Sequence, residues 1–217
     1  MKTYIILIAT VLSSVFAIGQ TTQTYTFTIE GMTCDACANT ATKTLQSAKN
    51  VESASVDFET KTATVTGNLT ETEIKSILEE NTNFEAFFEG ETPLEPLSDE
   101  EKSELDISII KGGDKLKFAD YMTEGKITIF DFYADWCGPC RVFSPKVEHF
   151  IKNNPNVSLR KVDIVDWGSD LSGQLTKKYE MPALPFVLIF DAKGKLIGKV
   201  AGNHIDEVEA IIKANSK

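Results

Sequence analysis

The sequence KITIFDFYADWCGPC, residues 126–140, joins a β-rich apolar stretch directly to a pair of cysteines. Its first part is dense in β-branched and aromatic residues, which predicts a buried strand. The following RVFSPKVEHFIKNN, residues 141–154, has apolar residues at helical intervals, and Pro145 is expected to kink that helix. Cys137 and Cys140 are therefore expected where a strand ends and a helix begins.

This position favours a redox-active dithiol. The helix dipole and the free N–H groups of the first turn favour a thiolate at Cys137, and a thiolate is the species that attacks a disulfide. Cys140, one turn later, can resolve the resulting mixed disulfide, while Gly138 and Pro139 shape the loop. A zinc half-site is the alternative, but no further Cys or His pair in this part of the sequence is spaced to complete a tetrahedron.

The rest of the C-terminal half alternates between strand and helix patterns, which predicts a mixed α/β sheet covered by helices. We expect strands over residues 107–110, 157–164, 186–190 and 194–202, and helices over residues 114–122, 171–179 and 205–215.

A smaller unit precedes this one. TYTFTIEG, residues 24–31, alternates apolar and polar residues and predicts a strand, and a helix is expected over residues 37–48. A hairpin over residues 53–67, a helix over 68–82 with Thr70 and Glu73 as a capping box, and a strand over 85–88 follow. The order β-α-β-β-α-β is that of the ferredoxin-like split βαβ arrangement.

The N-terminus predicts export. Lys2 is followed by an apolar run over residues 4–18 and then small residues, the order of a secretory signal peptide, with cleavage expected after Gly19 or alternatively after Ala17. The run is shorter than the roughly 20 apolar residues of a spanning helix, so no permanent membrane span is expected. We expect a periplasmic or extracellular protein.

These patterns divide the chain into four parts: a signal peptide over residues 1–19, a ferredoxin-like domain over 24–90, a linker over 91–106 and an α/β domain over 107–217. The linker holds two prolines and an acidic run, which predict a semi-extended, solvated segment, although SDEEKSEL within it can form a short helix. The net charge of −10 without a basic stripe excludes nucleic acid as a partner.

The segment FDFYADWCGPCRVFSP, residues 130–145, resembles the active site of thioredoxins, and the resemblance covers about residues 107–217. It implies a thioredoxin fold and disulfide exchange by Cys137 and Cys140. The residue after the expected cis-proline is Phe186, where the family often has a smaller polar residue, and this departure concerns the choice of partner. The resemblance further implies that Pro185 is the cis-proline beside the dithiol, Asp131 a buried proton-relaying acid, Lys161 its basic neighbour, Trp136 the ring beside the nucleophile and Gly202 part of the substrate groove.

The other cysteine pair lies in GMTCDAC, residues 31–37, which within its β-α-β-β-α-β setting resembles the loop of heavy-metal-associated domains such as copper chaperones. The resemblance covers about residues 25–89 and implies that Cys34 and Cys37 bind a metal, with Met32 beneath the loop and Phe84 near the site. Two thiolates on a loop suit the soft ion Cu(I), and the lack of nearby His or further Cys disfavours a closed Zn(II) site. Zn(II) and Hg(II) are the alternative ions, and a second redox dithiol is the alternative role.

The leading hypothesis is therefore an exported thiol–disulfide oxidoreductase of reducing type with a Cu(I)-binding module and no organic cofactor. Its expected partners are proteins with disulfides or copper-binding cysteines, together with a membrane thiol electron donor. Two alternatives stay open. One is a non-enzymatic copper-binding protein whose C-terminal domain only recognises a partner, and the other is an internal relay between the two CxxC pairs.

Overall fold

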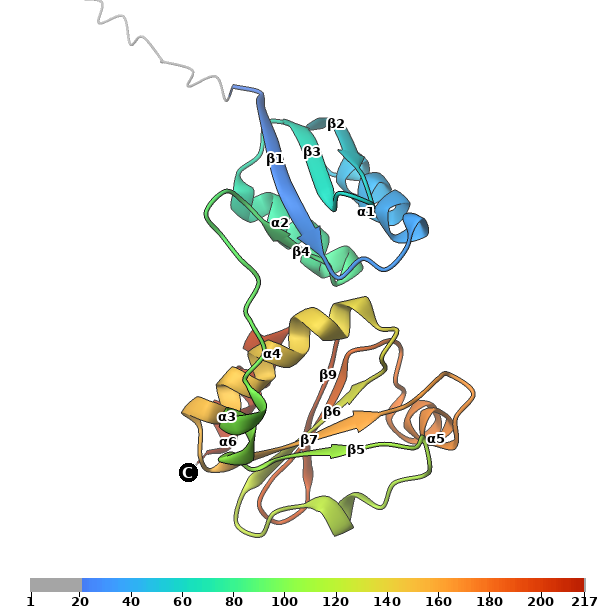
Figure 1. The fold of residues 1–217 in the computed structure, drawn as a ribbon, viewed down its shortest axis with the longest axis vertical. Coiled ribbons are helices and arrows are strands. Elements are labelled where there is room, and N and C mark those ends of the chain that lie inside the picture. The colour runs from blue at the N-terminus through green and yellow to red at the C-terminus, as the bar shows by residue number, and fades with distance from the viewer. Residues whose placement is uncertain (1–20, 217) are drawn as a thin grey trace, which may run out of the picture.

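The computed structural model describes residues 21–216, so the predicted signal peptide lies outside the described residues. The described chain forms two units, one above the other in Figure 1. The N-terminal unit consists of β1 (Gln23–Glu30), α1 (Asp35–Ser47), β2 (Val51–Val56), β3 (Thr62–Gly67), α2 (Glu71–Thr82) and β4 (Glu85–Phe87). Its strands form an antiparallel sheet in the order β2-β3-β1-β4, which confirms the predicted β-α-β-β-α-β arrangement.

The core of this unit follows from the alternation seen in the sequence. Phe27 and Ile29 of β1 are buried and pack with Leu45 of α1 and Ile74 of α2. Helix α2 begins at a capping box, in which the Glu73 N–H donates to the Thr70 hydroxyl at 3.2 Å and the Thr70 N–H donates to the Glu73 carboxylate at 2.7 Å. The unit therefore has a continuous apolar core of its own.

The C-terminal unit is built on a five-stranded mixed sheet in the order β5-β7-β6-β8-β9. β5, β7 and β6 run parallel, and β8 and β9 run antiparallel to their neighbours, which confirms the predicted mixed α/β class. Its elements are β5 (Ile107–Ile110), β6 (Ile127–Tyr133), α4 (Gly138–Asn153), β7 (Val157–Asp163), α5 (Asp170–Tyr179), β8 (Phe186–Phe190), β9 (Leu196–Ala201) and α6 (Ile205–Asn215).

Successive residues of β6 belong to different cores, because side chains alternate across a strand. Phe130 and Phe132 pack in one buried cluster, whereas Ile129 packs in another with Phe143 of α4. Asp131 shares the alternation of Ile129, which directs its carboxyl toward α4. The strand thus places one charged group beneath the helix that carries the cysteines.

The helix predicted over residues 114–122 is wrong: only a 3₁₀ turn, η1 (Phe118–Tyr121), forms there. The Leu116 N–H donates to the Gln174 side chain at 2.7 Å, and the Gln174 amide donates back to the Leu116 carbonyl at 2.7 Å. Phe118 is buried, with its ring centroid 4.9 Å from that of Phe130. Tertiary contacts therefore use the backbone groups that a helix would have needed.

The acidic segment between the units lies along α4 (Figure 1). It contains a short helix, α3 (Asp99–Ser103), and Leu97 just before it is buried. The Leu97 N–H donates to the Glu148 carboxylate at 3.3 Å, and Lys152 of α4 forms an ion pair with Glu101 at 2.7 Å. The second half of this segment is thus part of the C-terminal unit.

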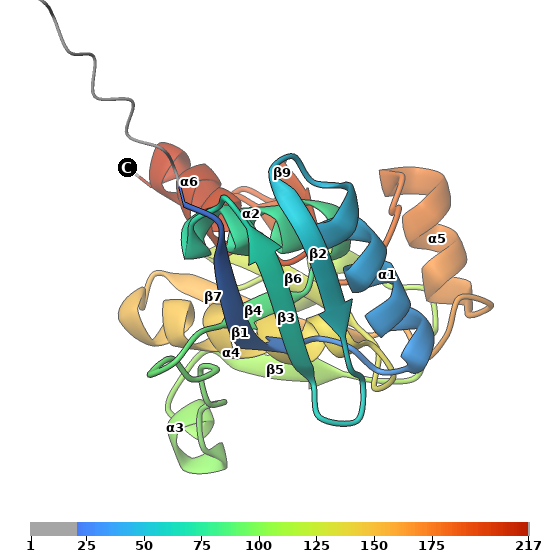
Figure 2. The same cartoon turned by 90° about the horizontal axis from the view of Figure 1, so that it is seen from above.

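The N-terminal unit lies over α4, as the view from above shows (Figure 2). β1 contacts α4, and Lys146 of α4 pairs with Glu85 of β4 at 3.2 Å. Across residues 21–216, no helix is both long and apolar enough to cross a membrane.

Candidate active site and metal-binding loop

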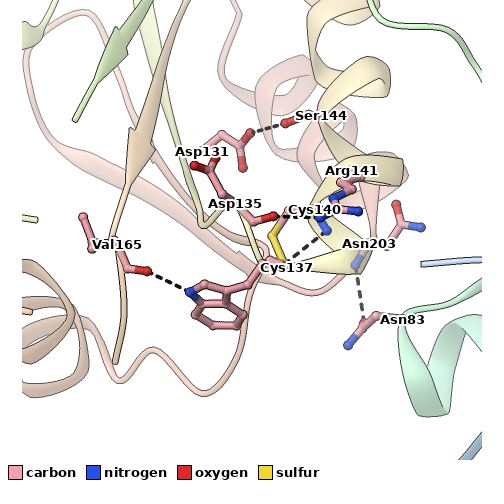
Figure 3. Close-up of a disulfide and its surroundings, with 10 residues drawn as sticks. Asn83, Asp131, Asp135, Cys137, Cys140, Arg141, Ser144, Val165 and Asn203 are labelled. Atoms are coloured by element: carbon pink, nitrogen blue, oxygen red, sulfur yellow. Dashed lines mark hydrogen bonds between the residues drawn. A yellow bond between two sulfur atoms is a disulfide. The ribbon is translucent and has the colours of Figure 1, made fainter. Parts of the chain in front are cut away.

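Cys137 and Cys140 lie at the start of α4, as predicted from the sequence. Cys137 is the N-cap residue, and its sulfur accepts the Cys140 N–H at 3.2 Å (Figure 3). The two residues form a disulfide and are only 4% and 3% exposed. The sulfur that is expected to carry negative charge in the reduced form therefore lies at the N-terminus of α4 and accepts one backbone N–H there.

Asp131 is a buried acid behind this dithiol. Its carboxylate accepts the Ser144 hydroxyl at 3.2 Å, and its other oxygen has no hydrogen-bond partner among residues 21–216. Burial raises the pKa of Asp131 to about 6, against the opposing effects of the Lys161 ammonium and the Ser144 hydroxyl. A group with this pKa accepts a proton close to neutrality.

Lys161 lies opposite Asp131 on β7, but its ammonium donates to a different acid. It bonds Glu148 at 2.6 Å, and the second oxygen of Glu148 is 3.2 Å from the Lys102 ammonium. A cavity of about 440 Å³ brings Cys140, Ser144, Glu148 and Lys161 to one surface. A row of polar and charged side chains thus extends from Cys140 to Lys102 in the segment between the units.

Glu148 is the residue of this site that sequence reasoning missed. It is only 1% exposed, although glutamates on helices are usually solvated. The sequence does contain a pattern that points to Glu148. Cys140, Ser144 and Glu148 recur every four residues and therefore share one face of α4. What the spacing could not give was the burial of that face by Leu97 and Lys102.

Pro185 and Trp136 flank the dithiol. The Leu184–Pro185 peptide bond is cis, and Leu184 packs in the same buried cluster as the two cysteines. The Pro185 carbonyl accepts the Gly202 N–H at 2.8 Å. The Trp136 indole donates to the Val165 carbonyl at 2.7 Å, while the ring stays 45% exposed. The cis peptide thus joins a residue packed in the cluster of the cysteines to Pro185, and the Trp136 ring is fixed next to Cys137 by its bond to Val165.

Cys34 is the N-cap residue of α1, at the end of the loop that follows β1, and Cys37 lies in the first turn of that helix. Both are free thiols with their sulfur atoms 2.8 Å apart, and Cys34 is exposed whereas Cys37 is half-buried. Burial raises the pKa of Cys37, but hydrogen bonds with Cys34 and Thr33 outweigh it, so the pKa is lowered overall. Met32 is buried beneath the loop, as expected from the resemblance.

These two thiols fit a soft metal ion. Both donors are sulfur, and the exposure of Cys34 leaves a path for an ion to enter. Among the described residues, no group of three or more His, Cys, Asp or Glu side chains could hold a metal, so no third side-chain ligand is prepared here.

The structure also brings the two cysteine loops together. The carbonyl of Gly31 approaches Gly138 so closely that a Cβ on Gly138 would overlap it. No local pattern predicts this contact, because the two glycines are separated by more than a hundred residues.

Comparisons with known proteins agree with both units. Residues 26–85 match the family model of the heavy-metal-associated domain, and residues 111–214 match that of thioredoxin. Thioredoxin-1 of Saccharomyces cerevisiae is 33% identical over 100 residues, which cover 46% of this chain and 91% of that protein. A thioredoxin of Echinococcus granulosus is 33% identical over 104 residues, covering 48% of this chain and 90% of that protein. The H-type thioredoxin of Fagopyrum esculentum is 34% identical over 92 residues, covering 42% and 74%.

The unit that carries Cys137 and Cys140 matches these thioredoxins over most of their length. The two family models confirm the predicted ferredoxin-like and thioredoxin folds. The chain therefore belongs to the thioredoxin family of disulfide oxidoreductases and carries a heavy-metal-associated domain ahead of its thioredoxin domain.

Proposed function

We propose that this protein is an exported thiol–disulfide reductase whose heavy-metal-associated domain binds Cu(I). The observation that carries the reductase is the geometry of Cys137, which caps α4 and accepts the Cys140 N–H, with the buried acid Asp131 behind it. A thiolate at a helix N-terminus attacks disulfides, and a nearby acceptor with a raised pKa serves the second cysteine.

The reaction begins when the Cys137 thiolate attacks a substrate disulfide and forms a mixed disulfide. Asp131 then takes the proton of Cys140, and the Cys140 thiolate attacks the Cys137 sulfur. The substrate leaves as a dithiol, and Cys137–Cys140 is left as the disulfide. An external thiol donor, which we propose to be a membrane protein, returns two electrons and two protons to this pair.

The substrates we propose are proteins whose cysteines must be reduced before they receive copper. Support comes from the two sulfur donors of Cys34 and Cys37, one of them exposed, in the same chain as the reductase. Zn(II) and Hg(II) are the alternative ions, because both also bind thiolates. Export is supported by the apolar run after Lys2, and N-terminal sequencing of the secreted or periplasmic protein tests it.

Insulin reduction by the full chain, with a dithiol donor in excess, tests the enzymatic proposal. Cys137→Ser is expected to abolish reduction while Cu(I) binding is retained. A wild-type chain without any insulin reduction would refute the reductase and favour a protein that only recognises its partner.

Competition with a chromophoric Cu(I) chelator tests the metal proposal. The double variant Cys34→Ser/Cys37→Ser is expected to lose the competition that the wild type wins, and Cys137→Ser is the matched control with one sulfur removed elsewhere. Equal competition by wild type and double variant would refute binding at this loop.

A further inference from the structure

We propose that the Cys34–Cys37 pair, when it is oxidised to a disulfide, is itself a substrate of the Cys137–Cys140 dithiol in the same chain. This inference rests on the thiol–disulfide exchange proposed above. It assigns the reductase a substrate that is built into the protein: the metal-binding loop, which can hold a metal only as thiols.

The first observation is the contact between the two cysteine loops. A Cβ on Gly138 would overlap the Gly31 carbonyl and would lie 2.8 Å from the methyl group of Thr33. A Cβ on Gly31 would lie 3.6 Å from the Cα atom of Pro139. Gly138 directly follows Cys137, and Thr33 directly precedes Cys34. Cys137, which attacks, and Cys34, which is attacked, are therefore each next in sequence to a residue at the close approach between the loops.

A shared hollow gives the second observation. Thr33 and Trp136 both line a depression of about 630 Å³, together with Arg141 of α4 and Phe58 of the N-terminal unit. Each of the first two residues directly precedes the first cysteine of its pair. The exposed sulfur of Cys34 thus belongs to a loop that borders the same open space as the nucleophile's tryptophan.

The N-terminal domain also occupies the groove expected for substrates. The Asn203 N–H donates to the Asn83 side chain at 3.4 Å (Figure 3), and a Cβ on Gly202 would overlap that side-chain oxygen. Gly202 is itself bonded to the carbonyl of the cis-proline. The end of α2 therefore contacts the segment that is bonded to the cis-proline, while the loop before α1 contacts Gly138, so the N-terminal unit touches the C-terminal unit at two places near the dithiol.

The contacts of this docking surface are polar and incompletely paired, which lowers the cost of opening it. Lys146 of α4 pairs with Glu85 at 3.2 Å and donates to the Asn203 side chain at 3.1 Å. One oxygen of Glu85 and the side-chain nitrogen of Asn203 are buried without a hydrogen-bond partner among the described residues. Unpaired buried polar groups regain water when an interface opens. Opening would expose Cys137 to the external donor that must reduce it again.

The step balances within the chain. The Cys137 thiolate attacks the exposed Cys34 sulfur, the Cys34–Cys37 bond breaks, and Cys37 leaves as a thiolate that takes up a proton. Cys140 then loses its proton to Asp131 and attacks Cys137, which releases Cys34. Two electrons have moved from the Cys137–Cys140 dithiol to the Cys34–Cys37 disulfide. The products are two thiols in the metal loop and one disulfide at the dithiol, which is the distribution that the structure contains.

Trapping the mixed disulfide in the full chain tests this relay. Cys140→Ser removes the thiol that would release Cys34, and Cys37→Ser removes the thiol that would attack Cys34 and reverse the step. Oxidation of this double variant with one equivalent of diamide is therefore expected to leave Cys34 bonded to Cys137. After acid quenching and alkylation, tryptic mapping without reductant should show peptide 127–141 linked to the peptide that contains Cys34. Mixing light and ¹⁵N-labelled chains should give no light–heavy pairs, because the bond forms within one chain.

A matched pair of variants tests the docking that carries the proposal. Asn83 and Asn50 both have positive φ, 62° and 70°, so glycine fits the backbone at either position. In the Cys37→Ser/Cys140→Ser background, Asn83→Gly is expected to lower the yield of the internal bond about threefold to tenfold, as the loss of an interface hydrogen bond predicts. Asn50→Gly, away from the groove, should leave the yield unchanged.

Three outcomes would overturn the relay: no Cys34–Cys137 bond, a bond only between separate chains, or equal yields in the two glycine variants. If insulin reduction by the wild type persists in such a case, the proposed function stands and only the internal substrate is refuted. Loss of insulin reduction itself would instead refute the reductase.

Discussion

Replacing Asp131 by asparagine should stabilise the protein and slow it at the same time. The carboxyl is 1% exposed, and burial raises its pKa from 3.8 to about 6. One pKa unit corresponds to about 1.4 kcal/mol, so the ionised carboxylate destabilises the fold by about 3 kcal/mol at pH 7.5. Asparagine keeps the shape of the side chain and removes the charge.

The sign of the pH dependence follows from the direction of this pKa change. The folded state holds the proton more tightly, so the unfolded chain ionises first and the free energy of unfolding falls as the pH rises from about 4 to 6. Asp131→Asn should therefore exceed the wild type by about 3 kcal/mol at pH 7.5 and by less than about 1 kcal/mol at pH 4.

Urea unfolding followed by tryptophan fluorescence measures this difference. The chain has only two tryptophans, Trp136 and Trp167, so the signal comes from the thioredoxin domain alone. Asp135→Asn, at an exposed position of the same domain, is the control and should change little. Equal stabilisation by Asp131→Asn at both pH values, with the cysteines oxidised throughout, would refute a raised pKa.

The same variant should reduce insulin more slowly, by at least about tenfold at pH 7, because Cys140 loses its proton acceptor. If Asp131→Asn raises the free energy of unfolding and lowers the rate of insulin reduction, Asp131 acts as a base and not as a group that stabilises the fold. An unchanged rate would show that water alone accepts the proton.

Other contacts lead to further predictions. Glu148→Gln removes the charge that two lysines share in a buried position, and urea unfolding should show a loss of about 3 kcal/mol, whereas Glu180→Gln, in the exposed ion pair with Lys199, should change little. Leu45→Ala leaves a cavity in the heavy-metal-associated domain and should destabilise it by about 3 kcal/mol in circular dichroism unfolding curves, whereas Leu94→Ala, 46% exposed, should not. Thr70→Ala deletes the cap of α2 and should lower the stability of the same domain by about 1 kcal/mol; a loss near zero would mean that solvent replaces the cap.

Much of the fold and of the candidate site can be predicted from short sequence patterns. The dithiol at a strand–helix junction, the cap at Thr70 and the order of six elements around the metal loop all depend on residues close together in the sequence. Local rules of alternation, capping and turn chemistry act over a few residues, and those predictions are confirmed.

The features that sequence could not supply depend on distant contacts. Glu148 is buried because Leu97 and Lys102 cover it, and no spacing rule connects residues about fifty positions apart. The contact between Gly31 and Gly138 depends on how the N-terminal unit packs against the C-terminal unit. The helix expected at residues 114–122 failed because Gln174 takes up the backbone groups of Leu116.

The attachment of the linker to α4 sets how far the two domains can part. Glu91 accepts the Phe88 N–H at one end, and Leu97 is bonded to Glu148 at the other, so only residues 92–96 are available as a tether. Five extended residues reach about 17 Å, which is less than the diameter of about 30 Å of a small folded domain. A globular partner therefore does not fit between the two attachment points, and it can approach only where the domains swing apart about the tether. The shortness of the tether favours an extended peptide strand, or the edge of a partner, as the form in which an external cysteine pair reaches Cys137.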